Sequence, residues 1–273
     1  MNRKYVRMLR DGLQGCLGVL LGCLVLFPVF YGAAGAFKTP SEMIAYPPGL
    51  MPASFAFTDN FRAVFTQAPM LRYFLNSLVT ALLTAVVRLG MAVLAAYAFA
   101  FFSFRGERIL FFLLMGTMML PADTLVITNY QTVSRLGLTD TYLGICIVSF
   151  VGASQMFMLR QHFKASPISA REAAMMDGCG EMRFLLSVLL PMSLPVISVL
   201  FVQCFIAQWN AYLWPLMITN TDLMRTVQVG ITMLTTPEGT NYGTILAGAA
   251  VVMVPSVILF AVLHRSMTGG NEK

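Results

Sequence analysis

Two ionisable side chains, those of Arg88 and Asp123, lie inside long apolar stretches of the sequence. Charged groups are costly within a bilayer, so they tend to pair with each other or to mark the path of a transported solute. Arg88 can pair with Asp123, or it can solvate a polar or anionic solute, because a guanidinium has a fixed fork of donors that suits phosphate. The two make a poor nucleophile and base, so we expect solute binding and no catalytic residues.

Amide and aromatic side chains follow in a later apolar stretch. Gln203, Ala207 and Asn210 are spaced at i, i+4 and i+7 and therefore share one face of a helix. A small residue between two amides suits a water-filled cavity or hydrogen bonds between helices. Trp209 and Tyr212 are either anchors at the membrane surface or aromatic faces that meet a sugar. The candidate translocation path consists of Arg88, Asp123, Gln203, Asn210, Trp209 and Tyr212.

The composition is that of a membrane protein. The chain has 273 residues, 58% of them hydrophobic and 11% charged, and its mean hydropathy is +0.74, whereas a soluble domain needs more surface charge. The basic residues flank apolar stretches and form no stripe, which argues against nucleic acid as a partner. The five cysteines include no C-x-x-C pair, and neither a Walker A nor an H-E-x-x-H sequence occurs. We therefore expect no metal site and no ATP site on this chain.

Apolar stretches long enough to cross a bilayer, about 20 residues each, predict an all-α membrane protein. We expect one transmembrane domain over residues 1–273, with no soluble domain. The first stretch follows four basic residues and resembles a signal peptide, but its long apolar run favours a retained helix. Pro191, Pro195 and Pro255 are expected to bend their helices. The six predicted spans are residues 12–36, 71–102, 108–130, 141–160, 184–214 and 242–263.

Basic residues are distributed unequally between the two sides of these spans. Of the 18 Lys and Arg residues, twelve fall on the side of the N-terminus, five fall on the other side, and Arg88 lies within a span. Loops that stay in the cytoplasm carry an excess of basic residues. We therefore expect both termini and the loop of residues 161–183 to be cytoplasmic.

The loop of residues 161–183 contains a short polar segment typical of a surface helix. Pro167 ends the preceding helix, and Ser169-x-x-Glu172 has the pattern of a capping box, in which two side chains bond backbone N–H groups at the helix start. Gly178 is a natural C-terminal stop. We expect a helix of about two turns, too short to cross the bilayer. On these residues alone, it is either a well-capped linker or a site for a partner protein.

The spacing in this loop resembles the EAA loop of ABC-importer permease subunits. Glu172-Ala-Ala-x-x-Asp-Gly178 is followed by Leu190-Pro191, and further motifs from about residue 70 onward are similar to the MalG-like permeases of carbohydrate-uptake importers. Cys179-Gly180 departs from the Ala-Ser that is usual in the family. The further motifs are Asn76-Ser77, Ala95-Ala-Tyr97-Ala98, Met119-Leu-Pro121, Trp209-Asn-x-Tyr-Leu-Trp-Pro215 and Pro255.

The resemblance implies a type I ABC-importer permease fold, with six transmembrane helices, a core over residues 70–265 and a cytoplasmic coupling helix within residues 161–183. It implies a second permease subunit, two ATP-binding cassette subunits that hold ATP and Mg²⁺, and an extracytoplasmic solute-binding protein, at the cytoplasmic (inner) membrane of a bacterium. It implies no cofactor on this chain. The coupling residues that it implies are Ser169, Glu172, Ala173, Ala174, Asp177 and Gly178.

The substrate and the energy source leave alternatives open. Arg88, the stretch Thr236-Pro-Glu-Gly-Thr240 and the C-terminal span are similar to the glycerol-3-phosphate branch of the family, which suggests glycerol-3-phosphate or a glycerophosphodiester. A neutral oligosaccharide or polyol fits the sequence equally well. A secondary carrier that works without ATP is a second hypothesis and would normally show an inverted repeat, which we do not find. An intramembrane enzyme is a third hypothesis and would need a reactive pair in the bilayer.

Overall fold

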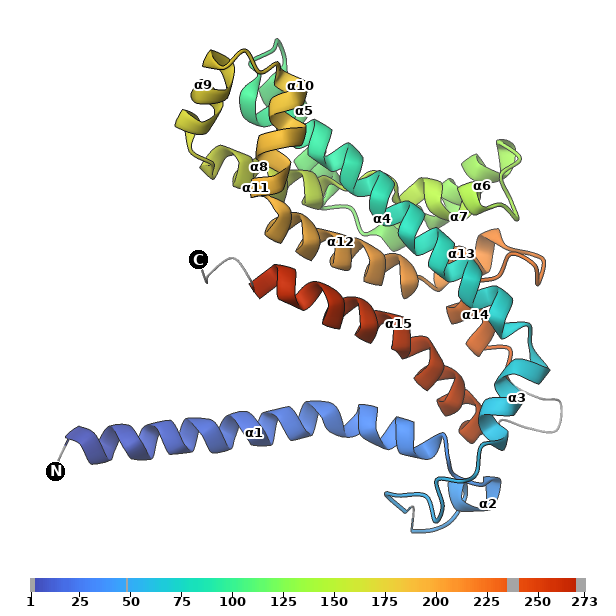
Figure 1. Cartoon of the computed structure of the whole chain (residues 1–273). Helices are drawn as coiled ribbons and strands as arrows, with labels where there is room; N and C mark the ends of the chain where they lie inside the picture. Colours follow the sequence, from blue (N-terminus) through green and yellow to red (C-terminus); the bar gives the residue numbers. More distant parts are fainter. Residues whose placement is uncertain (1–2, 48, 235–240, 269–273) are drawn as a thin grey trace. The chain divides into compact units, whose positions relative to one another are not determined.

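The structure is a computed structural model in which every regular element of the described residues is a helix (Figure 1). The predicted all-α fold is therefore confirmed. The stretch of residues 236–240, which the sequence singled out, lies outside the described residues. The described residues are 3–47, 49–234 and 241–268, and for residues 3–11, 122–123 and 263–268 only the backbone is described.

The chain divides into two compact units. Unit 1 consists of residues 1–69 and 231–253, and unit 2 consists of residues 70–230 and 254–273. The residues predicted to couple to an ATPase and those predicted to line a path all belong to unit 2.

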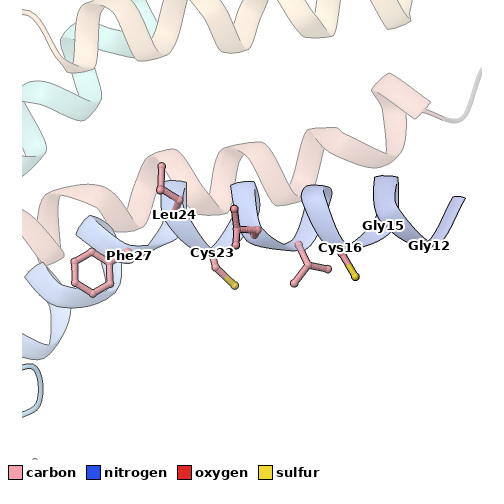
Figure 2. A pocket seen from close by; sticks show the side chains of 8 residues that line it. Gly12, Gly15, Cys16, Cys23, Leu24 and Phe27 are labelled. Carbon is pink, nitrogen blue, oxygen red and sulfur yellow. The ribbon is translucent and has the colours of Figure 1, made fainter. Parts of the chain in front are cut away.

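Unit 1 contains the long helix α1 (Arg3–Gly35), whose apolar side chains are exposed along most of its length. Figure 2 shows one face of this helix, where Gly12, Gly15, Cys16 and Cys23 line a shallow apolar hollow together with larger side chains. A helix that is apolar on every side suits a membrane environment. The other elements of this unit are α2 (Pro40–Met43), α3 (Asp59–Gln67) and the first part of α15 (Tyr242–Thr268).

Unit 2 is built around the long helix α4 (Met70–Phe101), which packs against α8 (Ala153–Ala165) and α12 (Leu194–Trp209). The second half of α4 is buried among apolar side chains of these partners, including Phe163 and Leu200. The remaining helical elements of residues 70–231 are α5 (Glu107–Thr117), η1 (Ala122–Leu125), α6 (Val126–Arg135), α7 (Tyr142–Cys146), η2 (Ile147–Ser149), α9 (Ile168–Met176), α10 (Glu181–Phe184), η3 (Leu185–Leu189), α11 (Leu190–Met192), α13 (Leu213–Ile218) and α14 (Val227–Ile231).

Five of the six predicted spans correspond to helices of the described chain. Gly12–Gly35, Met70–Phe101 and Tyr242–Val262 are each long and apolar enough to cross a membrane. Two bent pairs of helices are long and apolar enough when each pair is taken together. These pairs are Tyr142–Ser149 with Ala153–Ala165, bent by 52°, and Glu181–Met192 with Leu194–Trp209, bent by 82°.

The prediction of one continuous span over residues 108–130 is wrong. The helix α5 ends at Thr117, and the chain resumes as the short η1 and the more polar α6. Pro121 explains the break, because it has no N–H to donate and its ring excludes the carbonyl four residues earlier. The hydroxyls of Thr117 and Thr124 donate to the carbonyls of Leu114 and Pro121, both at 2.7 Å. These bonds satisfy carbonyls near the break.

The 82° bend lies at Ser193, between Pro191 and Pro195. Neither proline can donate a backbone hydrogen bond, so the helical ladder is interrupted twice within five residues. Ser193 is buried, and both its N–H and its hydroxyl donate to the carbonyl of Leu189, at 3.0 and 2.7 Å. The predicted bend at these prolines is confirmed, whereas α15 continues through Pro255 as one helix.

Candidate functional site

The helix α9 forms the centre of the predicted coupling loop, at the same end of unit 2 as α5 and α10 (Figure 1). The predicted capping box is wrong. The helix begins two residues earlier than the pattern requires, at Ile168, with Pro167 as the N-cap and no side-chain cap. Pro167 has a φ of −60° that suits a helix start, so Ser169 falls within the first turn. A capping box is found instead between Thr39 and Glu42, at the start of α2.

The predicted stop at Gly178 is confirmed. Gly178 has a φ of +73°, in the left-handed region that glycine adopts without strain. Its N–H donates to the carbonyl of Met175 at 3.1 Å, and the N–H of Cys179 donates to that of Ala174 at 2.9 Å. This pair of bonds is the Schellman motif, which satisfies the last carbonyls of a helix. The chain therefore turns sharply after α9.

The two faces of α9 have different surroundings. Ala174 and Met175 are half-buried and pack against the apolar core of unit 2. The other face is exposed and combines small, acidic and apolar residues, and Met176 is 89% exposed there. An exposed apolar side chain beside small residues suits contact with another protein. Of the predicted coupling residues, the exposed ones are Ser169, Glu172, Ala173, Asp177 and Gly178.

A polar triad connects α9 to the transmembrane helices. The guanidinium of Arg171 lies 2.5 Å from the carboxylate of Glu181, at the start of α10. The hydroxyl of Tyr97, near the end of α4, donates to the same carboxylate. Arg171 also lies over the ring of Phe101, 5.2 Å from its centre. The position of α9 is therefore linked directly to α4 and to the span that follows it.

Arg88 lies near the middle of α4, and its guanidinium reaches the bend between η2 and α8. One terminal nitrogen donates to the carbonyl of Val151 at 3.3 Å, while Nε is buried without a hydrogen-bond partner. The thiol of Cys204 lies beside the guanidinium. Among the carboxylates whose side chains the structure describes, none lies within 4.0 Å of Arg88. The charge thus has no ionic partner in this part of the chain.

One glutamine, Gln155, lies next to this charge and bonds a second glutamine, Gln203. A Cβ atom at Gly152 would lie 2.7 Å from Arg88 Nε and would also contact Gln155 Oε1. Gln155 is buried, and its Nε2 donates to Gln203 Oε1 at 3.4 Å. Gln155 Oε1 accepts from the hydroxyl of Ser154 at 3.0 Å. The polar cluster formed by Arg88, Gln155 and Gln203 therefore joins α4, α8 and α12.

The polar face predicted on α12 is exposed in unit 2. Gln203, Ala207 and Asn210 are all exposed, and Asn210 Oδ1 accepts from Gln228 Nε2 at 3.1 Å. Tyr212, just after α12, is 41% exposed. Amides that faced lipid within a span would be costly, so this face requires water, a solute or another polar protein surface.

The two remaining residues of the candidate translocation path are Trp209 and Asp123. Trp209 is buried, stacked on Phe205 with a centroid distance of 5.7 Å and edge-on to Phe74 at 5.3 Å. Trp209 therefore packs inside unit 2, directly before the exposed Asn210. The backbone of Asp123 lies in η1, but its side chain lies outside the described part of the chain. A pair between Arg88 and Asp123 stays a prediction.

Sequence reasoning missed several of these residues. Gln155 is an amide within an apolar stretch, and intramembrane polarity is a signal that could have found it. The Tyr97 hydroxyl and Glu181 are 84 positions apart, so their contact depends on tertiary packing. Gln228 lies outside the predicted spans and gave no signal.

The sequence matches an established family over most of its length. Residues 23–267 match the family described as binding-protein-dependent transport system inner membrane component. The chain is 30% identical over 282 residues to the sn-glycerol-3-phosphate transport system permease protein UgpE of Agrobacterium fabrum, which covers 98% of this chain and 97% of that protein. It is also 30% identical over 262 residues to the UgpE of Yersinia pestis bv. Antiqua, covering 93% and 92%.

The fold is similar to that of a solved transporter. A chain of a bacterial ABC transporter involved in the import of the acidic polysaccharide alginate superposes with a TM-score of 0.84 and 20% identity, covering 96% of this chain and 97% of that one. Permeases of this family act together with a further permease, an ATPase and a solute-binding protein. The chain thus belongs to the inner-membrane components of binding-protein-dependent transport systems and is a multi-pass, non-catalytic permease subunit of an ABC importer.

Proposed function

We propose that ATP hydrolysis on partner subunits drives this permease through contact with α9. The exposed face of α9 carries this proposal. Ser169, Glu172 and Ala173 offer small or acidic contacts, and Met176 supplies an apolar side chain that can enter a groove. Asp177 lies exposed beside it. A docking surface of this kind is useful only if its movement is transmitted, and the triad of Arg171, Glu181 and Tyr97 supplies that connection.

Ala174 and Gly178 have a different part in the same contact. Ala174 packs α9 onto the core of unit 2, and Gly178 lets the chain turn directly after the helix. We assign both to the shape of the docking surface. The complex contains one further permease, two ATP-binding cassette subunits with ATP and Mg²⁺, and one extracytoplasmic solute-binding protein.

The translocation path runs along the exposed polar face of α12. Gln203, Asn210 and Tyr212 line this path together with Arg88. Trp209 stabilises the path, because its ring packs against Phe74 and Phe205 and so holds the neighbouring residue Asn210 in position. We retain Asp123 as a further residue of the path, on the basis of its intramembrane position in the sequence.

We propose one permease domain over residues 1–273, in the inner membrane of a bacterium. The family match extends from residue 23 to residue 267 and so includes parts of both units. Both termini and the loop of residues 161–183 are cytoplasmic in this proposal, since that side carries the excess of basic residues.

The solute is either a glycerol phosphate or an oligosaccharide. The UgpE relatives are named for sn-glycerol-3-phosphate transport, which supports glycerol-3-phosphate or a glycerophosphodiester. The structural neighbour is involved in alginate import, and its similar fold keeps an oligosaccharide as the second candidate. Either solute is hydroxylated and suits a path lined by amides.

The coupling proposal is tested at Gly178, in the complete complex reconstituted in proteoliposomes. A Cβ at this position meets no atom within 4 Å, so any effect of a substitution comes from the backbone and not from crowding. Gly178→Pro removes the N–H that bonds Met175 and forbids the left-handed conformation. It should abolish ATP-driven uptake and the stimulation of ATP hydrolysis by the loaded binding protein.

Gly178→Asn is the matched variant, since asparagine tolerates the left-handed conformation. It should retain most of the uptake. Normal uptake by Gly178→Pro would contradict the coupling role of this turn. Uptake that persists when ATP is withheld from the wild-type complex would favour a secondary carrier.

A further inference from the structure

We propose that the polar cluster of Arg88, Gln155 and Gln203 is an anion-binding site, and that the transported solute is a hydroxylated molecule with a phosphate or carboxylate group. This inference rests on the proposed translocation path along α12. It goes further because it assigns a charge to the solute and names the residues that recognise that charge.

The charge of Arg88 is the first argument. An arginine within a transmembrane helix is stabilised when it meets an anion, a carbonyl or water. Arg88 has one backbone carbonyl, that of Val151, and its Nε has no acceptor. No carboxylate approaches it among the side chains that the structure describes. An anionic solute that approaches the half-buried guanidinium would supply the missing counter-charge.

The direction of the hydrogen bonds is the second argument. Gln155 is held from one side by Ser154, and its amide donates to Gln203 Oε1. This bond uses one of the two lone pairs of Gln203 Oε1, while the exposed amide NH₂ of Gln203 has no described partner. Donors from Gln203 and from Arg88 therefore outnumber the acceptors at the accessible end of the cluster. A surface of donors around a positive charge selects an anion over a cation.

The N-terminus of α8 adds to the positive electrostatic potential around Arg88. The helix α8 has 13 residues, and Gly152 is its N-cap with no side-chain hydrogen bond. The first N–H groups of a helix lack partners within it and carry a partial positive charge. Broken helices whose N-termini face a path are a recurring way to bind anionic groups in transporters. Gly152 also brings this backbone close to Arg88 Nε, since it has no Cβ.

The test measures ATP-driven uptake by the complete importer in proteoliposomes, with three labelled solutes. These are sn-glycerol 3-phosphate, a uronic-acid disaccharide and the neutral disaccharide maltose, each with excess binding protein. The first two arms separate a phosphate from a carboxylate, and the third tests the requirement for charge. Uptake is normalised to the amount of assembled complex, measured by co-purification of the subunits.

We expect uptake of one of the two anionic solutes and none of maltose. Arg88→Gln should lower the uptake rate per complex by roughly ten- to hundredfold, as expected for a lost hydrogen bond to a charged group. Arg88→Lys should recover part of the rate, because it restores the charge without the fork of donors. Gln203→Leu should lower the rate by a smaller factor.

Arg72→Gln is the matched control, because it removes an arginine from the exposed start of the same helix. It should stay within about twofold of the wild-type rate. A wild-type complex that imports only maltose, or an Arg88→Gln complex with wild-type uptake of the anion, would overturn the anion site while leaving the importer function intact. A wild-type complex that imports no solute with ATP present would instead count against the proposed function.

Discussion

Arg171 and Glu181 form an ion pair whose closest atoms, Nη2 and Oε1, are 2.5 Å apart, and this pair closes the loop that holds α9. The two residues flank the turn at Gly178, so the pair fixes both the angle and the position of the helix. Tyr97 reaches the same carboxylate from α4. A displacement of α9 must therefore either move the transmembrane helices or break these bonds.

The first prediction concerns this pair. Arg171→Ala and Glu181→Gln should each lower the amount of solute imported per ATP hydrolysed by roughly fivefold or more, in the range of typical coupling energies. Stability should change by only about 1 kcal/mol or less, because both side chains are about one third exposed. The measurement is uptake and ATP hydrolysis in the same proteoliposomes. Arg183→Ala, at an exposed arginine of the same loop, serves as the control. An unchanged ratio in both variants would refute the coupling role.

The second prediction concerns Gly152. In Gly152→Ala the new Cβ would displace the ends of Arg88 and Gln155, which are flexible side chains, so the fold should persist. Uptake per complex should fall by about tenfold, because misplacing a binding group weakens the interaction that it makes. Gly90→Ala, two residues from Arg88, meets no atom within 4 Å and should have no such effect. Equal uptake by the two variants would show that the spacing at Gly152 is unimportant.

The third prediction concerns Asn76, which is buried at the start of α4. Its Nδ2 donates to the carbonyls of Leu223 and Arg225, both at 2.9 Å, and its Oδ1 accepts from Tyr142 at 2.7 Å. Asn76→Leu should destabilise the protein by about 2–4 kcal/mol, because buried polar groups lose their partners. Tyr142→Phe removes one bond and should cost about 1 kcal/mol. Thermal unfolding of the purified complex measures the loss of stability in each variant. Similar unfolding midpoints for Asn76→Leu and Tyr142→Phe would contradict the prediction that Asn76→Leu is the more destabilising.

The fourth prediction concerns pH and Asp140, which has a φ of +55°. Burial favours its neutral form, but hydrogen bonds from the N–H groups of Thr221 and Asn220 outweigh this effect and hold the pKa of Asp140 below its ordinary value. A lowered pKa in the folded state means that the carboxylate stabilises the protein above the unfolded pKa of about 3.9. This contribution is lost as the pH falls through the folded pKa.

Asp140→Asn keeps a residue type that tolerates the left-handed backbone and removes the charge. It should destabilise the protein by about 1 kcal/mol at neutral pH. The difference from wild type should shrink as the pH falls below the unfolded pKa of about 3.9 and through the lower folded pKa of Asp140. The exposed Asp59 offers a control, Asp59→Asn, with little expected change. A difference that is the same at all pH values would exclude the carboxylate as its cause.

The spans and the turn after α9 could be predicted because local physics determines them. A long apolar run must be buried in lipid or protein, and Gly178 stops a helix through its own backbone freedom. The start of α9 was misplaced because a Ser-x-x-Glu pattern is common, while the fixed φ of Pro167 decided the first residue. The break within residues 108–130 was not predicted for a related reason. Hydropathy values carry no information about the N–H group that Pro121 lacks.

The polar contacts between helices depend on tertiary packing, so local sequence patterns could not predict them. Gln155 and Gln203 are 48 positions apart and meet only because α8 and α12 both pack against α4. The motif at Asn76 was visible in the sequence, but its role, holding the backbone of residues 223 and 225, was not. Sequence therefore located the segments that matter, and the structure supplied their partners.

The bend at Ser193 has a mechanical result. The two halves of that helix pair, Glu181–Met192 and Leu194–Trp209, are inclined to each other by 82°. If the first half moves along its own axis, the second half therefore moves almost perpendicular to its own axis. The first half begins at Glu181, whose carboxylate pairs with Arg171 of α9, and the second half carries Gln203. A small movement of α9 along the axis of the first half would therefore shift the amide of Gln203 sideways, across the proposed translocation path and not along it.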